Sequence, residues 1–237
     1  CILAFKSKVL NKTHMKKVLV SGVSGYVGQH CAAELLKNGY AVKGSVRSLS
    51  KADEVTKAIK KVIDPKGNLE YCELNEKDTY ETNTKSVEYA VNIANELDIP
   101  LLYISTAGIF DGKKDFYDET DQPNPLGHYG RSKYLGEVAV QESSKDYIIC
   151  RAGWMMGAGE IKDKKFIQKL IKQIKEGVSS LNVVNDKLGT PTYTHDFANN
   201  VKLLIDKDER GLFNMVCKGL TGRLEVANEL ISLIGLK

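Results

Sequence analysis

Residues 17–28, which read KVLVSGVSGYVG, decide the fold of this chain. Lys17–Ser21 is a short run rich in β-branched residues, and residues 22–28 follow it with three glycines in the pattern GxxGxxG. Apolar side chains then recur at helical spacing from Tyr26 to Lys37. A strand that passes through a glycine-rich turn into a helix is typical of the first βα unit of a parallel sheet.

Segments with strand-like and helix-like patterns continue to alternate along the chain. Further strands are expected at residues 40–46, 69–74, 100–105, 147–151 and 212–216. Helices are expected at residues 51–63, 80–97, 129–141, 165–174, 196–205 and 225–234. This alternation predicts an α/β protein with a doubly wound parallel sheet and helices on both faces of the sheet.

The composition argues against several classes of function. The 237 residues carry 34 basic and 30 acidic side chains, a net charge of +4, so a nucleic-acid partner is not expected. The five cysteines are scattered without CxxC spacing, and the four histidines have no ligand spacing, so neither a disulfide framework nor a metal site is predicted. No run approaches the ~18 apolar residues of a membrane span, and a cytoplasmic protein is expected.

The glycine loop is predicted to bind the phosphates of a dinucleotide. Glycine permits a tight turn, a close approach of the backbone to a pyrophosphate, and close packing of the helix on its strand. The start of the helix adds unpaired N–H groups and a partial positive charge. The residues expected to contact the cofactor in this segment are Gly22, Ser24, Gly25, Tyr26, Val27 and Gly28.

The end of the second expected strand indicates which dinucleotide binds. A site that prefers NAD usually has an acidic residue there, which bonds the ribose 2′-hydroxyl. This strand ends instead with Ser45-Val46-Arg47-Ser48, and Lys51 lies just beyond. A guanidinium can bond a 2′-phosphate in a bidentate, charge-assisted way, so Arg47 and Lys51 favour NADP(H). A solvent-facing arginine at a strand end is the alternative interpretation of Arg47.

Tyr129 and Lys133 form a YxxxK pattern on an expected helix, where residues four apart share a face. A nearby ammonium stabilises a phenolate, so Lys133 is expected to lower the pKa of Tyr129 from its usual value of about 10. Ser105 and Thr106 end a buried strand earlier in the chain. A hydroxyl at that strand end can hold a substrate carbonyl while Tyr129 delivers a proton, although a turn cap also explains Thr106.

The glycine loop, Ser105-Thr106 and YxxxK together resemble the extended short-chain dehydrogenase/reductase family, which has an NAD(P)-binding Rossmann fold. Several segments are similar to the dTDP-4-dehydrorhamnose reductases within it. These segments are residues 105–112 (STAGIFDG), 119–137 (ETDQPNPLGHYGRSKYLGE), 151–154 (RAGW), 184–196 (VNDKLGTPTYTHD) and 222–236 (GRLEVANELISLIGL). Residues 15–51 are also similar to the dihydroflavonol reductases, whose second strand carries the same Val-Arg pair.

The resemblance implies a role for each matching residue. Thr106 would orient the substrate carbonyl and Tyr129 would donate the proton. Lys133 would lower the pKa of the tyrosine and hold the nicotinamide ribose, so Tyr129 and Lys133 also count as cofactor contacts. Ser105 and Trp154 would contact the substrate, although a core aromatic equally explains Trp154.

The chain departs from the family pattern at residues 74–80, where relatives have a longer segment that includes a central strand. The sheet is therefore expected to lack one central strand segment. Glu73, at the end of the third expected strand, would lie near the adenine. Residues 1–14 are interpreted as a disordered or non-native leader and residues 15–151 as the NADP-binding domain. Residues 152–237 would form a small substrate-binding lobe, interleaved with the sheet and incomplete at its C-terminus.

The leading hypothesis is an NADPH-dependent reductase of a 4-keto-deoxysugar nucleotide. One alternative is another reductase or epimerase of the same superfamily, although Arg47 argues against the epimerases, which usually prefer NAD. The alternative from another class is a non-catalytic, NADP-binding regulatory subunit. By resemblance alone, the helices near Tyr80 and Tyr129 could form the face of a homodimer.

Overall fold

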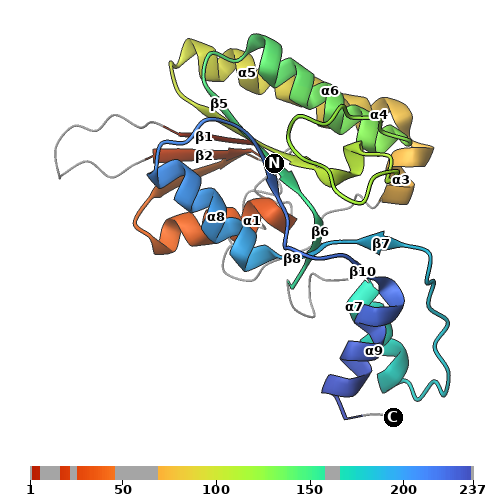
Figure 1. Cartoon of the computed structure of the whole chain (residues 1–237). Coiled ribbons are helices and arrows are strands. Elements are labelled where there is room, and N and C mark those ends of the chain that lie inside the picture. Colours follow the sequence, from red (N-terminus) through yellow and green to blue (C-terminus); the bar gives the residue numbers. More distant parts are fainter. Residues whose placement is uncertain (1, 6–16, 22–25, 46–68, 158–165, 236–237) are drawn as a thin grey trace.

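The computed structural model describes residues 2–5, 17–21, 26–45, 69–157 and 166–235 (Figure 1). Its main sheet has the strand order β3-β2-β1-β4-β5-β9. The strands are β1 Ile2–Phe5, β2 Lys17–Ser21, β3 Ala41–Ser45, β4 Leu101–Thr106, β5 Tyr147–Ala152 and β9 Gly211–Met215. The pairs β2–β3, β4–β5 and β5–β9 are parallel. The expected α/β fold is confirmed.

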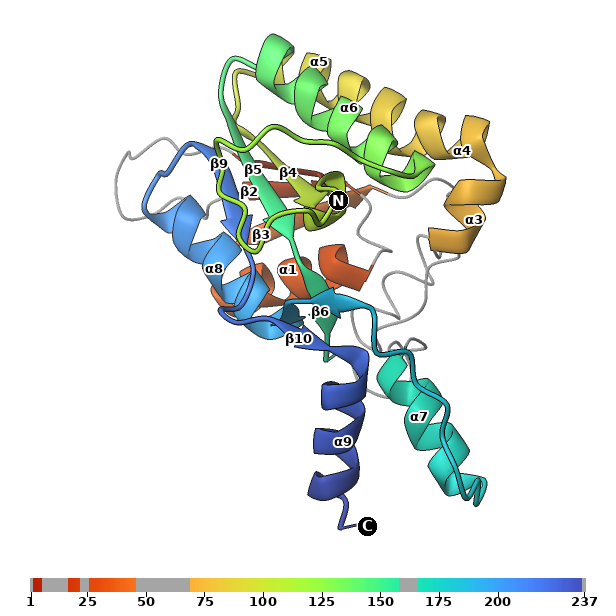
Figure 2. The same cartoon turned by 45° about the vertical axis from the view of Figure 1, so that its right-hand side comes forward.

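Helices cover both faces of this sheet (Figures 1 and 2). On one face lie α3 Leu69–Leu74, α4 Glu76–Tyr80, α5 Ser86–Glu96 and α6 His128–Ser143, with a π-helical turn, η2 Glu81–Lys85, between α4 and α5. On the other face lie α1 Tyr26–Lys37 and α8 Thr194–Asp206. The helix expected at residues 51–63 lies outside the described residues.

Strand β4 shows why the sheet needs helices on both faces. Leu102 and Ile104 belong to the core cluster that includes residues of α1 and α8. Leu101 and Tyr103 belong to the cluster that includes residues of α5 and α6. A strand that is buried on both faces has an almost continuous apolar sequence, and PLLYIS shows this feature.

The N-terminal strand β1 corrects two expectations. It lies between β2 and β4 and runs antiparallel to both, with Ile2 opposite Ser21 on one side and Tyr103 on the other. Residues 2–5 are therefore part of the sheet rather than of a disordered leader, and the central position expected to be empty is filled. Without β1, unpaired backbone N–H and C=O groups would line both neighbouring strands inside the protein. An extended segment from elsewhere in the chain satisfies them.

The third strand expected at residues 69–74 is also wrong, because this segment forms helix α3. Six residues are too short for periodicity to distinguish a helix from a strand. Tyr71 and Leu74 are 44% and 78% exposed, so the segment lacks the apolar faces of a sheet strand. It packs instead near the start of α6, where Glu73 forms hydrogen bonds.

The C-terminal part forms a lobe that projects from the sheet (Figure 2). It contains two helices and two small two-stranded sheets, β6–β8 and β7–β10. Its elements are α7 Phe166–Lys175, α9 Arg223–Leu233, β6 Trp154–Met156, β7 Leu188–Gly189, β8 Pro191–Tyr193 and β10 Thr221–Gly222. None of the helices in the described ranges is long and apolar enough to cross a membrane.

Candidate active site at the carboxyl ends of the strands

The predicted catalytic residues lie at the edge of the sheet where its parallel strands end. Thr106 is the last residue of β4, Tyr129 lies in the first turn of α6, and Lys133 follows one turn later. In open α/β sheets, ligands bind outside the carboxyl ends of the strands. The fold therefore carries these three residues to the edge where a ligand is expected.

The side chain of Thr106 lies near the phenol of Tyr129 and lowers the pKa of that phenol. The Thr106 Oγ1 atom also accepts a hydrogen bond of 3.1 Å from the backbone N–H of Gly108, so it caps the short 3-10 helix Ala107–Ile109. The interpretation of Thr106 as a turn cap is therefore confirmed, while its role in holding a substrate carbonyl stays a prediction. The turn orients the hydroxyl group that lies near the tyrosine.

The phenol of Tyr129 is held in its protonated form. Burial raises its pKa above the usual 10, and the nearby side chain of Thr106 opposes this rise in part. The spacing of Tyr129 and Lys133 predicts a lowered pKa for Tyr129, and the structure differs in direction. A protonated phenol is the form that can donate a proton to a substrate oxygen.

Lys133 is buried against the sheet. Its Nζ donates a hydrogen bond of 2.8 Å to the backbone oxygen of Ile104 and lies 4.1 Å from the centre of the Tyr103 ring. Burial lowers the pKa of Lys133 from 10.5 to about 7, while the nearby carboxylate of Glu137 opposes this shift. The ammonium is therefore turned to the strand, and its charge depends on pH near neutrality.

Glu73 caps the start of the helix that carries Tyr129. Its carboxylate accepts hydrogen bonds from the backbone N–H groups of His128 at 2.9 Å and Tyr129 at 3.1 Å. These two bonds lower the pKa of Glu73. Gly127 permits this close approach, since a Cβ atom there would lie 2.6 Å from Glu73 Oε1. Glu73 was expected near the adenine because a strand was expected to end there. Since residues 69–74 form helix α3 instead, the basis of that expectation is removed.

The two expected substrate contacts have different surroundings. Ser105 is only 3% exposed, and its Oγ has no hydrogen-bond partner among the described residues. Trp154 is partly buried in the C-terminal lobe, with its ring centre 6.2 Å from that of Phe166 and 5.5 Å from the Arg223 guanidinium. The structure thus places Thr106 beside Tyr129, whereas Trp154 packs within the lobe.

Part of the predicted cofactor site lies outside the described residues, namely Gly22, Ser24, Gly25, Arg47 and Lys51. The parts that are described fit a dinucleotide. Tyr26 and Val27 open α1 close to the end of β2, Gly28 is buried within this helix, and the first turn has no acidic residue to repel a phosphate. The ends of β2 and β3 lie side by side, because Ser21 pairs with Ser45.

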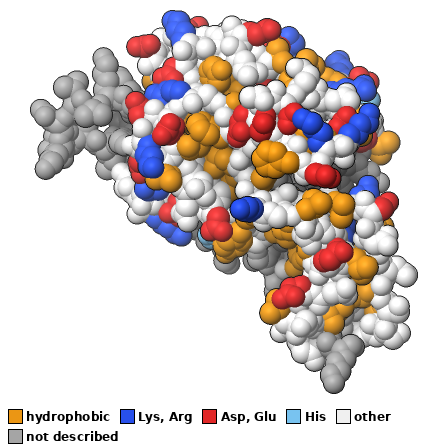
Figure 3. Space-filling view, viewed as in Figure 1, with side chains coloured by type: hydrophobic (Ala, Val, Ile, Leu, Met, Phe, Trp, Pro, Cys, Tyr) orange, Lys and Arg blue, Asp and Glu red, His pale blue; other side chains and the backbone are white. Residues whose placement is uncertain are grey.

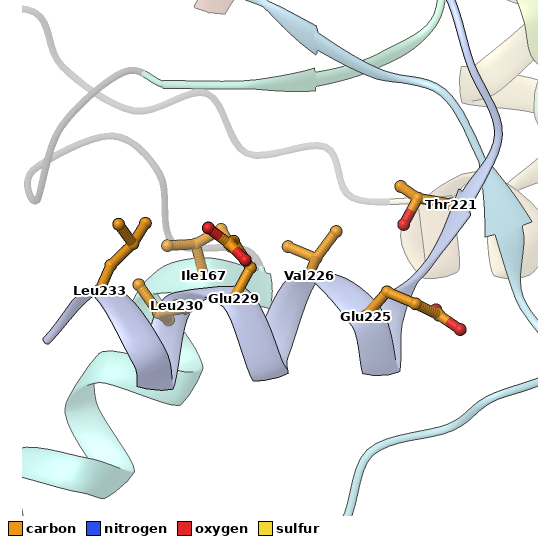
Figure 4. Close-up of a pocket in the computed structure, with 7 residues that line it drawn as sticks. All are labelled: Ile167, Thr221, Glu225, Val226, Glu229, Leu230 and Leu233. Atoms are coloured by element: carbon orange, nitrogen blue, oxygen red, sulfur yellow. The ribbon is translucent and has the colours of Figure 1, made fainter. Parts of the chain in front are cut away.

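A hollow of about 460 Å³ lies away from this constellation, between α7 and α9 (Figure 4). Apolar side chains of both helices line it, among them Ile167, Val226, Leu230 and Leu233. None of its lining residues comes from β4 or α6, so we do not assign the chemistry to it. Within the described ranges, no group of three or more His, Cys, Asp or Glu side chains could hold a metal ion.

Sequence reasoning missed the buried pair of Glu137 and Arg151 behind the site. Glu137 is fully buried on α6 and pairs with Arg151 on β5 at 2.8 Å. The available signal was an acidic residue four positions after Lys133, on the same face of the helix. Its partner could not be identified because α6 and β5 meet only in the tertiary fold.

The doubly wound sheet, with a threonine at a strand end and a tyrosine and a lysine one helical turn apart, defines the class of extended short-chain dehydrogenases/reductases. Comparison with known families makes the assignment more specific. The chain belongs to the family described as RmlD substrate binding domain, whose model matches residues 15–237.

Several known proteins are similar to this chain. The spore coat polysaccharide biosynthesis protein SpsK of Bacillus subtilis is 28% identical over 236 residues, which cover 94% of this chain and 81% of SpsK. The crystal structure of dTDP-4-dehydrorhamnose reductase from Yersinia enterocolitica has a TM-score of 0.80 at 30% identity, over 92% of this chain and 80% of that one. Methionine adenosyltransferase 2 subunit beta of Danio rerio is 25% identical, over 87% of this chain and 70% of that protein.

Proposed function

We propose that this chain is an NADPH-dependent reductase of a sugar nucleotide, acting on the 4-keto group of a deoxysugar. The observation that carries the proposal is the proximity of Thr106 to Tyr129 at the carboxyl edge of the sheet, with Lys133 one turn along the same helix. The similarity to a dTDP-4-dehydrorhamnose reductase supports the substrate class. Arg47, which follows the end of β3 by two residues in the sequence, supports NADPH over NADH.

The residues of this chain have distinct tasks in the proposed reaction. Bound NADPH would supply the hydride that is added to the carbonyl carbon. Thr106 would donate a hydrogen bond to the carbonyl oxygen, and Tyr129, whose raised pKa keeps it protonated, would transfer its proton to that oxygen. Lys133, with its pKa near 7, would complete the polar environment of the phenol when charged.

Removal of the hydroxyl oxygen of Tyr129 tests the proposal. In Tyr129→Phe we expect kcat for NADPH oxidation with dTDP-4-keto-6-deoxysugars to fall by about 10²- to 10⁴-fold, the typical contribution of a general acid. NADPH affinity, measured by fluorescence titration, should remain within twofold of the unchanged protein. Tyr134→Phe is the matched control, because Tyr134 lies on the same helix and, among the described residues, its hydroxyl accepts only a long hydrogen bond from Gln122. Turnover that survives in Tyr129→Phe would refute the assigned role.

A regulatory subunit is the second candidate function, and the similarity to a subunit of methionine adenosyltransferase favours it. Such a protein would bind NADPH but would not oxidise it with any 4-keto sugar nucleotide. In that case Tyr129→Phe would change neither binding nor stability to a measurable extent. Turnover by the unchanged protein would exclude this candidate.

We also propose that the chain forms a homodimer through α5. Tyr89, Ile93 and Leu97 are 66%, 48% and 57% exposed and recur every four residues along this helix and its end. A helical stripe of exposed apolar side chains is typical of an interface. Sedimentation velocity on the purified chain would test this, since a monomer at micromolar concentration contradicts it. The cytoplasmic location stays a prediction.

A further inference from the structure

Arg151 and Glu137 form a buried ion pair between the sheet and the catalytic helix. Arg151 is 3% exposed and Glu137 is not exposed at all. The Arg151 Nε donates to both carboxylate oxygens, at 3.1 and 3.2 Å, and Nη2 donates to Oε2 at 2.8 Å. This bidentate geometry restricts both the angle and the position of α6 relative to β5.

The same guanidinium supports the segment that covers the sheet edge. Its central carbon lies 5.2 Å from the centre of the Phe110 ring, and Phe110 stacks on Tyr117 with 4.4 Å between ring centres. Asn214 is the neighbour of Arg151 on β9, and its amide group donates to the backbone oxygen of Tyr117 at 3.3 Å. The Asn214 backbone N–H donates to Glu119 Oε1 at 2.7 Å.

This covering segment, residues 107–127, connects Thr106 to the helix of Tyr129. Phe110, which contacts Arg151, therefore lies in the sequence between Thr106 and Tyr129, the two residues of the candidate active site. Glu137, in turn, lies one helical turn after Lys133 on α6. Arg151 thus contacts both the segment that leads into the catalytic helix and the helix itself.

We propose that Arg151 is a positioning residue, which holds residues 107–127 through Phe110 and α6 through Glu137 in the arrangement that places Thr106 beside Tyr129. The inference rests on the proposed reductase function. It assigns to Arg151 an effect on catalysis without contact with substrate or cofactor.

Stability alone does not account for this pair. Burying two charges costs several kcal/mol per ion, and apolar residues of similar volume often replace such a pair without loss of stability. The Arg151 Nη1 is also buried without a hydrogen-bond partner in the described part of the chain. A lone buried donor destabilises the folded state, so an apolar pair would satisfy a purely structural requirement more simply.

The test replaces the pair by apolar residues of similar volume. In the double variant Glu137→Leu/Arg151→Met, we expect a melting temperature and an NADPH affinity close to those of the unchanged protein. Its kcat should fall by about a hundredfold, the effect of a misplacement of about 1 Å. Hydrogen–deuterium exchange should become faster in residues 107–127 and in the first turn of α6, and stay unchanged in α1 and α8.

A second variant covers the case in which the double variant does not fold. Arg151→Lys retains the charge but loses the bidentate geometry, so we expect a lower kcat and the same local increase in exchange. The matched control is Arg210→Lys, which alters the partly exposed ion pairs of Arg210 with Asp146 and Asp208. It should leave both measurements unchanged.

The results separate this inference from the proposed function. A folded variant with unchanged kcat and unchanged exchange in residues 107–127 would overturn the positioning role. If the unchanged protein reduces no 4-keto sugar nucleotide, the proposed function fails, and hydrogen–deuterium exchange alone then tests the positioning role. Unaltered exchange in Arg151→Lys refutes that role, and faster exchange in residues 107–127 supports it.

Discussion

Deletion of residues 1–14 should abolish the cooperative fold, because β1 lies in the middle of the main sheet. This strand has four register pairs with β2 and three with β4. At roughly one hydrogen bond per pair and about 1 kcal/mol net for each bond, the loss is on the order of 7 kcal/mol. The total stability of a domain is about 5 to 15 kcal/mol, so the deletion removes most of it.

The assay is thermal and urea unfolding followed by circular dichroism, on the full chain and on residues 15–237. We expect a cooperative transition for the full chain and none, or one at much lower urea, for the deletion. A point variant gives an independent measurement. Leu3→Pro removes a backbone donor from the middle of β1 and should lower the urea midpoint, whereas Leu3→Val retains the donor and suits a strand.

One result would refute this reasoning. If residues 15–237 unfold at the same urea concentration and with the same steepness as the full chain, β1 contributes nothing to the sheet. The strand order β3-β2-β1-β4-β5-β9 would then be wrong at its centre, and the expectation of an N-terminal leader would be correct after all.

Two further predictions concern α6, the helix that carries Tyr129 and Lys133. The pKa of Lys133 is about 7 in the folded chain and about 10.4 when unfolded, so the unfolded state binds more protons between these values and stability should rise there by roughly 1.4 kcal/mol per pH unit. Lys133→Met should remove this rise, which urea unfolding of both proteins at pH 7.5 and pH 9 measures. If the unfolding free energy of both proteins changes equally with pH, the lowered pKa of Lys133 is contradicted. Gly136→Ala would place a Cβ atom 2.5 Å from Tyr103 Oη and 2.8 Å from the backbone oxygen of Asn83, and should lower the unfolding free energy by about 1 to 3 kcal/mol. An unchanged urea midpoint would show that α6 and η2 do not approach so closely.

Elements with strong local patterns could be predicted from the sequence alone. The expected segments Lys17–Ser21 and Tyr26–Lys37 match β2 and α1 to the residue, because a glycine-rich turn separates two clear periodicities. The helix expected at residues 80–97 is present but begins at Glu76 and contains a π-helical turn at Glu81–Lys85. That irregularity could not be predicted, since it depends on the packing of η2 against α6.

The candidate site, too, could be predicted from the sequence only in part. Thr106, Tyr129 and Lys133 were predicted from residue type and spacing, and the structure places the first two close together. The direction of the pKa shift of Tyr129 was not predicted correctly, because the rise of this pKa follows from burial. Burial depends on the segments that cover a side chain, and neighbouring residues in the sequence do not report it.

The sequence by itself determined the α/β alternation, the bounds of β2 and α1 and the residue types at the candidate site, since each depends on neighbours within a few residues. Only the tertiary structure decided that residues 2–5 fill the sheet, that residues 69–74 form a helix whose Glu73 caps α6, and that Arg151 pairs with Glu137. These three outcomes satisfy backbone or charged groups contributed by distant parts of the chain. The physical reason is that a buried hydrogen-bonding group requires a partner, and that partner can come from any distance along the sequence.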